Sequence, residues 1–133
     1  MMFRKFTAVL AATTLAAGPA AAQQNLSEVG YVTEGLIAVG IAYEISEVCG
    51  DINPRTLRGI AYLNQLRSHA KGLGFSNAEI DAYVDNRAEQ DRLEGIARAR
   101  LAGMGAAPGD EASHCAVGRA EITKRSTIGY LLR

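Results

Sequence analysis

Residues 29–50, VGYVTEGLIAVGIAYEISEVCG, decide the fold of this chain. Their apolar side chains recur at helical spacing and form two stripes on adjoining faces of one helix. The first stripe is Val29, Val32, Leu36, Val39 and Tyr43, and the second is Ile37, Ile41, Ile45 and Val48. A helix that is apolar on two faces packs against several partners at once. The segment therefore predicts the central helix of an all-α domain.

Start signals place about four helices along the chain, in a small bundle. Asn25 is expected to cap the first helix, and Asn53-Pro54 is typical of the start of the second. Residues 76–79 read as a capping box, in which Ser and Glu side chains satisfy free backbone N–H groups, and they open the third helix. Asp110 can cap the fourth helix. The closing residues Tyr130–Leu132 are expected to dock on the core.

The third helix carries two apolar sets that are out of phase. Ile80 and Val84 precede the polar run Asp85–Arg92, and Leu93 and Ile96 follow it about half a turn away from the earlier face. Two readings fit this pattern and the sequence leaves both open. Either the helix bends within the polar run, or its two ends pack on different neighbours.

The first 22 residues have the pattern of an export signal. Residues 1–5 are basic, residues 6–17 are uncharged and mostly apolar, and Ala20–Ala22 supplies the small residues that a signal peptidase needs. Cleavage is expected after Ala22, which leaves Gln23 as the new N-terminus. The apolar stretch is shorter than the about 20 residues that span a bilayer, so no retained membrane anchor is expected. These features predict a periplasmic or secreted protein.

The part left after cleavage, residues 23–133, is expected to form a single helical domain of 111 residues. The whole chain has 14 basic and 14 acidic residues, and the signal removes two basic ones, which gives the remainder a formal charge of −2. A nearly neutral domain has no electrostatic footprint for nucleic acid. It also has no basic cluster that would dock on anionic lipid.

The two cysteines of the chain, Cys49 and Cys115, are expected to form one structural disulfide. Export places the thiols where oxidation is permitted, and two is the number a single bond needs. Cys49 falls at the end of the first helix and Cys115 in the first turns of the fourth. A redox-active cysteine is the weaker reading, because the two are not spaced as C-x-x-C.

The histidines provide weak evidence for a metal. Glu111 and His114 share one helix face, but a di-iron bundle needs two such motifs and a closed zinc site needs four ligands. His69 lies outside any such motif. No haem-attachment, phosphate-binding or dinucleotide-binding motif occurs in the sequence. The chain is therefore expected to hold no metal and no cofactor.

The remaining candidates are acids and tyrosines. Asp81, Asp85 and Glu89 recur every four residues and are interpreted as a solvated ridge on the third helix. Glu94 and Arg98 are spaced for a favourable ion pair along a helix. The five tyrosines are interpreted mostly as packing residues.

Several segments together resemble a family of short exported bacterial proteins known only as a domain of unknown function. They are Gly40–Ile45 ahead of Cys49, Gly74–Ser76 with Glu79-Ile80 and Tyr83-Val84, Arg92–Glu94, Cys115–Gly118 and Ser126–Arg133. The resemblance covers most of residues 23–133. It implies export and helices throughout, and it assigns no activity and no catalytic residues.

Three functional hypotheses follow, from two classes. The first is a non-enzymatic binding or accessory protein acting on another envelope protein, because long apolar helices are present and no site chemistry is visible. The second is an acid- or stress-responsive periplasmic holdase chaperone, which would expose apolar surface at low pH. The third is a carboxylate-dependent envelope enzyme using Glu44, Glu47 or Asp51, which requires two acids that face each other across a cleft.

Overall fold

The computed structural model describes residues 25–133, and in that range the chain folds into helices without a β-strand. The elements are η1 (Leu26–Glu28), α1 (Gly30–Val48), α2 (Thr56–Gly72), α3 (Asn77–Val84), α4 (Arg87–Gly103), α5 (Glu111–Lys124) and α6 (Thr127–Tyr130). The all-α prediction is confirmed. Four long helices account for the expected bundle, and two short ones, α3 and α6, are added to it.

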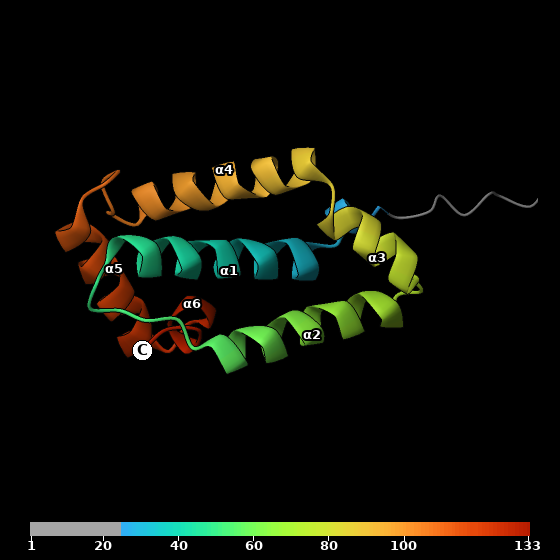
Figure 1. Ribbon diagram of the computed structural model, residues 1–133, viewed down its shortest axis with the longest axis horizontal. Helices are drawn as coiled ribbons and strands as arrows, with labels where there is room; N and C mark the ends of the chain where they lie inside the picture. The colour runs from blue at the N-terminus through green and yellow to red at the C-terminus, as the bar shows by residue number, and fades with distance from the viewer. Residues whose placement is uncertain (1–24) are drawn as a thin grey trace, which may run out of the picture.

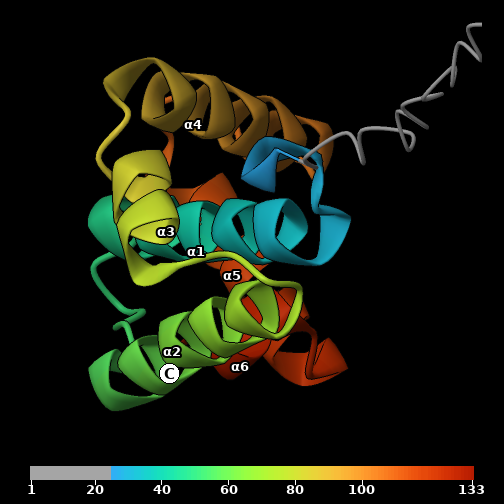
Figure 2. The same cartoon turned by 90° about the vertical axis from the view of Figure 1, so that its right-hand side faces the viewer.

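The three longest helices, α1, α2 and α4, form one layer with α1 in the middle. In Figure 1, α1 runs between α4 and α2, with α5 and α6 gathered at the end where α1 finishes. Figure 2 shows α4, α1 and α2 one above the other, with α3 on one side of the layer. Helix α1 touches α2, α4, α5, α6 and η1. This central position explains why its sequence is apolar on more than one face.

Two groups of buried side chains hold α1 in place. The larger group surrounds its C-terminal half, where Ile45, Cys49 and Leu132 are the most deeply buried large side chains. The smaller group surrounds its N-terminal end and joins it to η1, α2 and α3 through Val32, Ala70 and Ile80. Full burial of one such aliphatic side chain stabilises the fold by about 1.5–3 kcal/mol. The last residues of the chain therefore belong to the main core, as the prediction for the C-terminal segment required, although Tyr130 itself is half exposed.

The predicted start of the second helix is wrong. Helix α2 begins at Thr56, because the backbone just before it pairs with the C-terminus instead of coiling. Asn53 and Arg133 exchange two backbone hydrogen bonds of 2.8 and 2.9 Å, and Pro54 faces Leu132 in an isolated antiparallel bridge. The proline thus sits in extended chain, where its missing N–H costs nothing.

Two other caps decide how the polar run is folded. At residues 76–79 the Ser half of the expected capping box is present, since Glu79 N donates to Ser76 Oγ at 3.1 Å. The Glu79 carboxylate accepts from the Ser76 hydroxyl instead of a backbone N–H. Asn86 accepts from Glu89 N at 3.0 Å and starts α4 afresh. The third helix is therefore two helices, and its two apolar sets pack on different neighbours. Asn25, in contrast, makes no side-chain cap, so that expectation is wrong.

Candidate functional site

An open apolar groove runs along α1 between α2 and α4, closed at one end by α3. Two adjoining cavities of about 490 and 220 Å³ make it up, and both are lined by Leu36, Tyr83 and Val84. We call this surface the α1 groove. Its lining residues are Leu26, Val32, Leu36, Val39, Gly40, Tyr43, Glu44, Leu63, Asn64, Leu66, Arg67, Ala70, Ile80, Tyr83, Val84, Glu89, Gln90, Leu93, Glu94, Ala97 and Arg98.

Large apolar side chains stand exposed in this groove. Tyr43 on α1 is 60% exposed, Val84 at the end of α3 is 49% exposed, and Leu63 on α2 is 41% exposed. Each comes from a different helix, and each lines one or both cavities. Scattered apolar side chains are normal on a protein surface, whereas a contiguous apolar patch is typical of a binding surface.

Small residues set the depth of the groove. A Cβ atom at Gly40 would lie 3.3 Å from the Cβ of Ala97, so α1 and α4 approach each other closely at this point. On the other side, a Cβ at Gly35 would lie 2.6 Å from Leu66, which brings α2 close as well. Because both contacts are tight, the side chains of Leu36 and Val39 form a floor directly between the two walls.

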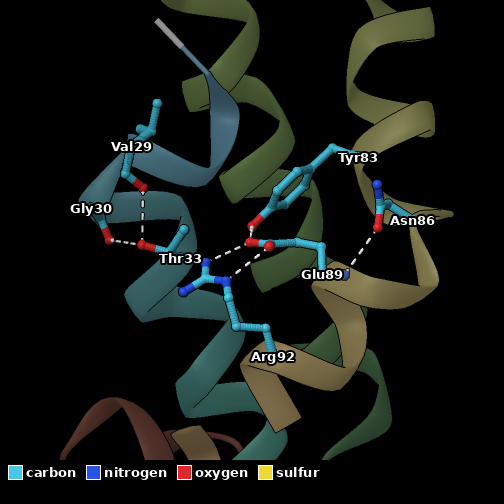
Figure 3. Close-up of polar contacts among 7 residues, drawn as sticks. All are labelled: Val29, Gly30, Thr33, Tyr83, Asn86, Glu89 and Arg92. Carbon is cyan, nitrogen blue, oxygen red and sulfur yellow. Dashed lines mark hydrogen bonds and ion pairs between the residues drawn. The ribbon is translucent and has the colours of Figure 1, made fainter. Parts of the chain in front are cut away.

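A polar cluster fixes the α3 end of the groove (Figure 3). Tyr83 Oη donates to Glu89 Oε1 at 2.9 Å, and Arg92 holds the same carboxylate through two hydrogen bonds of 2.8 and 2.5 Å. Burial, and then the hydrogen bond to Glu89, raise the pKa of Tyr83 to about 12. The hydrogen bonds from Arg92 lower the pKa of Glu89. The cluster therefore stays as a neutral phenol on an ionised carboxylate near pH 7 and links α3 rigidly to α4.

Charges on the groove walls are mostly neutralised in pairs. Arg98 binds Glu94 at 2.6 Å, which confirms the predicted pair, and Arg67 binds Asp81. Glu44 lines the groove and forms no ion pair with any residue of the described range. The end of the groove near Tyr43 is therefore left with negative charge.

The expected disulfide is present between Cys49 and Cys115. Their Cα atoms lie 5.2 Å apart, and both side chains are buried. Glu111 Oε1 accepts a hydrogen bond from Gly50 N next to the bond, so α5 also contacts the end of α1 through a side chain. The bond holds the end of α1 against α5, and neither cysteine lines the groove. The predicted cleavage point, Ala22 and Gln23, lies outside the described residues.

The residues considered for a metal are not brought together. His114 is buried, and its Nδ1 lies 2.7 Å from the carbonyl oxygen of Asp110. His69 stacks against Tyr31 with ring centroids 4.1 Å apart. Within residues 25–133, no group of three or more His, Cys, Asp or Glu side chains has the arrangement of a metal site.

The acids proposed for catalysis do not face one another across a cavity, because Glu44 and Glu47 lie one turn apart on the same helix. Glu47 and Asp51 are exposed, and Asp51 pairs with Arg119 at 3.3 Å. Glu44 alone of the three lines the groove, and the acids that share its lining, Glu89 and Glu94, are each held by an arginine. The predicted ridge is wrong as well, because Glu89 lies on α4 and not on the helix of Asp81. A general acid needs a raised pKa, and the pKa of Glu89 is lowered.

A cavity of about 430 Å³ lies apart from the α1 groove. It is lined by Tyr31, Tyr62, Arg100 and the start of α6. Arg100 and Glu34, which both line this cavity, form a two-point ion pair, one contact of which measures 2.8 Å. Burial raises the pKa of Tyr62, whose hydroxyl lies close to Gly35. The ion pair ties α4 to α1 across this cavity, and we assign the cavity a structural role.

The exposed apolar residues of the groove were missed by reasoning from the sequence. Tyr43 was interpreted as packing, together with the other tyrosines, and it is the most exposed of the residues that form the first stripe of α1. The only available signal was the double stripe itself. That stripe requires a partner on each face of α1, and the helices within residues 25–133 leave the groove face uncovered beyond α3.

The described residues thus define a small, disulfide-linked helical protein with an open apolar groove along its central helix. A family model described as a family of unknown function, DUF5333, matches residues 24–133, and the chain belongs to this family. The resemblance to a family of unknown function is confirmed. No curated protein and no solved structure matches the chain.

Proposed function

We propose that this chain is an exported, non-enzymatic binding or accessory protein of the cell envelope, and that it binds another protein through the α1 groove. The observation that carries the proposal is the groove itself, which presents Tyr43, Leu63 and Val84 from three helices to solvent. Burial of this surface by a partner would be favourable at roughly 25 cal/mol for each Å² of apolar area covered.

Export is the second part of the proposal. The basic start, the apolar stretch of residues 6–17 and the small residues before Gln23 support it. A disulfide supports it too, because disulfides persist in oxidising compartments. In the part of the chain that the structure describes, no helix has the length and apolar content needed to cross a membrane.

Two measurements test the proposal. Mass analysis of the protein recovered from outside the cytoplasm should give a chain that begins at Gln23, and an Ala22→Asp variant should keep the longer form.

A photo-reactive residue placed at position 43 in cells should cross-link one envelope protein, identified by mass analysis. The same residue at position 57, also exposed but outside the groove lining, should not. Equal cross-linking from both positions would contradict the proposed role of the groove.

A further inference from the structure

We propose that the occupant of the α1 groove is an amphipathic helix of another protein, about three turns long, with a Lys or Arg at the end of its apolar face. The basic side chain would lie beside Glu44 and Glu47. This inference rests on the proposed function and names the chemistry of the partner.

The length of the groove gives the length of the partner segment. The open floor begins beside α3 at Leu36, because Val32 is buried, and its charged end lies at Glu47, one turn beyond Tyr43. Leu36 and Glu47 both lie on α1. At 1.5 Å per residue, these positions are about 16 Å apart along α1, which is roughly three helical turns. A partner helix with apolar residues at i, i+3 or i+4, and i+7 would contact the floor from Leu36 to Tyr43, and its next turn would bring a basic side chain beside Glu47.

The walls of the groove favour a helix over an extended peptide. The floor and both long walls are helices α1, α2 and α4, whose backbone N–H and C=O groups are bonded within each helix. An extended peptide laid there would find no strand edge among the described residues, so the groove would offer its backbone no hydrogen bonds. A helix satisfies its backbone internally and needs to offer only an apolar face.

Charge determines what the partner carries at the open end. Both arginines among the lining residues are already engaged, Arg98 by Glu94 and Arg67 by Asp81. Glu44 forms no such pair in the described range, and neither does Glu47, which lies one turn further along α1. A cation on the partner would gain an attractive interaction with these two carboxylates, and an acid would be repelled.

The test uses synthetic peptides as probes. Fluorescently labelled 14-residue helical peptides with a Leu/Ala face would carry Lys, Gln or Glu at one end of that face, in two sets that place the residue at either end. Binding to the oxidised, full-length exported protein would be followed by fluorescence anisotropy at low and physiological salt. In one set, the Lys peptide should bind at least about tenfold more tightly than the Glu peptide, and added salt should reduce the difference.

Variants separate the two parts of the inference. Val84→Asp should weaken binding of every peptide more than about tenfold, because it places a charge in the apolar wall. A Glu44→Gln/Glu47→Gln double variant should keep binding but remove the preference for Lys. Leu73→Asp is the matched control, since it adds the same charge at a side chain that is 51% exposed, close to the 49% of Val84, and lies outside the groove. Circular dichroism and an intact disulfide would verify that each variant is folded.

The possible failures are distinguishable. Equal binding of the Lys, Gln and Glu peptides would overturn the basic partner while leaving a helix-binding groove. No peptide binding, with cross-linking from position 43 retained in cells, would overturn the helix and leave the proposed function standing. Light scattering could instead show a dimer of the chain. If Val84→Asp breaks that dimer and the peptides do not compete with it, the occupant is a second copy of the chain and the inference is overturned. Loss of both peptide binding and cross-linking would reject the proposed function too.

Discussion

Cys49 and Cys115 join the residue that directly follows α1 to the first half of α5 across 66 residues of sequence. The segment between them contains the whole of α2, α3 and α4. Closing a loop of this length restricts the unfolded chain far more than the folded one. In the chain-entropy view, such a bond stabilises the fold by about 4 kcal/mol.

A Cys49→Ala/Cys115→Ala variant is therefore expected to lose about 2–4 kcal/mol of unfolding free energy, the lower value allowing for residual structure in the unfolded chain. Urea unfolding of both proteins measures this difference. The natural protein should lose a similar amount when a reductant is added, and the variant should not respond to it. A variant as stable as the oxidised protein would contradict the structural role of the bond.

Substitution of Gly35 tests the close approach of α1 and α2. Gly35→Ala would place a Cβ 2.6 Å from a methyl group of Leu66, so we expect a loss of about 1–3 kcal/mol from overpacking. Gly95→Ala on α4 is the control, because a Cβ there meets nothing within 4 Å. The control should gain about 0.5–1 kcal/mol from helix propensity. Opposite signs in thermal or urea unfolding would confirm the contact.

Truncation of Leu132 tests the docking of the C-terminus. Its side chain is 1% exposed, so Leu132→Ala should cost about 2–5 kcal/mol through lost burial and the cavity left behind. Leu57→Ala removes the same atoms from a side chain that is 83% exposed, and it should change stability by less than about 0.5 kcal/mol. Similar effects of the two substitutions would show that the C-terminus is not part of the core.

Acid should weaken two of the links that α4 makes. Hydrogen bonds from Arg100 lower the pKa of Glu34, and those from Arg92 lower the pKa of Glu89. A carboxyl whose pKa is lower in the folded state stabilises the fold above its unfolded pKa of about 4.3, and that contribution is lost as the pH falls through the folded pKa. Both groups are close to water, so each is worth less than about 1 kcal/mol.

The expected result is a decline in unfolding free energy below about pH 4.3 that is smaller in a Glu34→Gln/Glu89→Gln variant. Urea unfolding across this range measures it. Fluorescence of an apolar dye, measured on the same samples, tests the holdase hypothesis. A chaperone of that kind must bind the dye more strongly as the pH falls. Dye fluorescence that stays flat from neutral to acid pH would argue against it.

Tyr83 should be the last tyrosine to ionise. Its pKa is raised to about 12, so the folded state holds the phenol proton more tightly than the unfolded chain does, and stability should fall as the pH rises from about 10 through about 12. Tyr83→Phe should remove the latest step from an ultraviolet absorbance titration and cost about 0.5–1.5 kcal/mol at neutral pH. A titration that keeps its latest step in the variant would assign that step to another tyrosine.

Local signals in the sequence predicted the helices and the disulfide well. The capping pairs at residues 76–79 and at Asp110 act through neighbours in sequence, so their effect is visible without the fold. The cysteine pair followed from count and compartment alone. The sequence indicated the break at Asn86 only in part. The phase of the apolar residues changes across Asp85–Arg92, which fits either a bend or two ends with different neighbours.

Contacts between residues far apart in the sequence explain the wrong predictions, because they override the local patterns. Asn53-Pro54 has the pattern of a helix start, yet its backbone pairs with residues nearly 80 positions later, as the 77-residue separation of Arg55 and Leu132 illustrates. The exposure of Tyr43 likewise depends on which helices are absent from one side of α1, and no local pattern carries that information. The groove could be found only from the packing of whole helices.

The pairing of Arg133 with Asn53 has a consequence for the order in which the molecule is assembled. Because synthesis runs from the N-terminus, Leu131 and Leu132 are made long after α1, and both are buried in the main core. Until those residues arrive, α1 lacks one of its covers, and the pairing that precedes α2 has no partner strand. A chain that stops before Leu131 is therefore expected to leave part of the apolar surface of α1 in water.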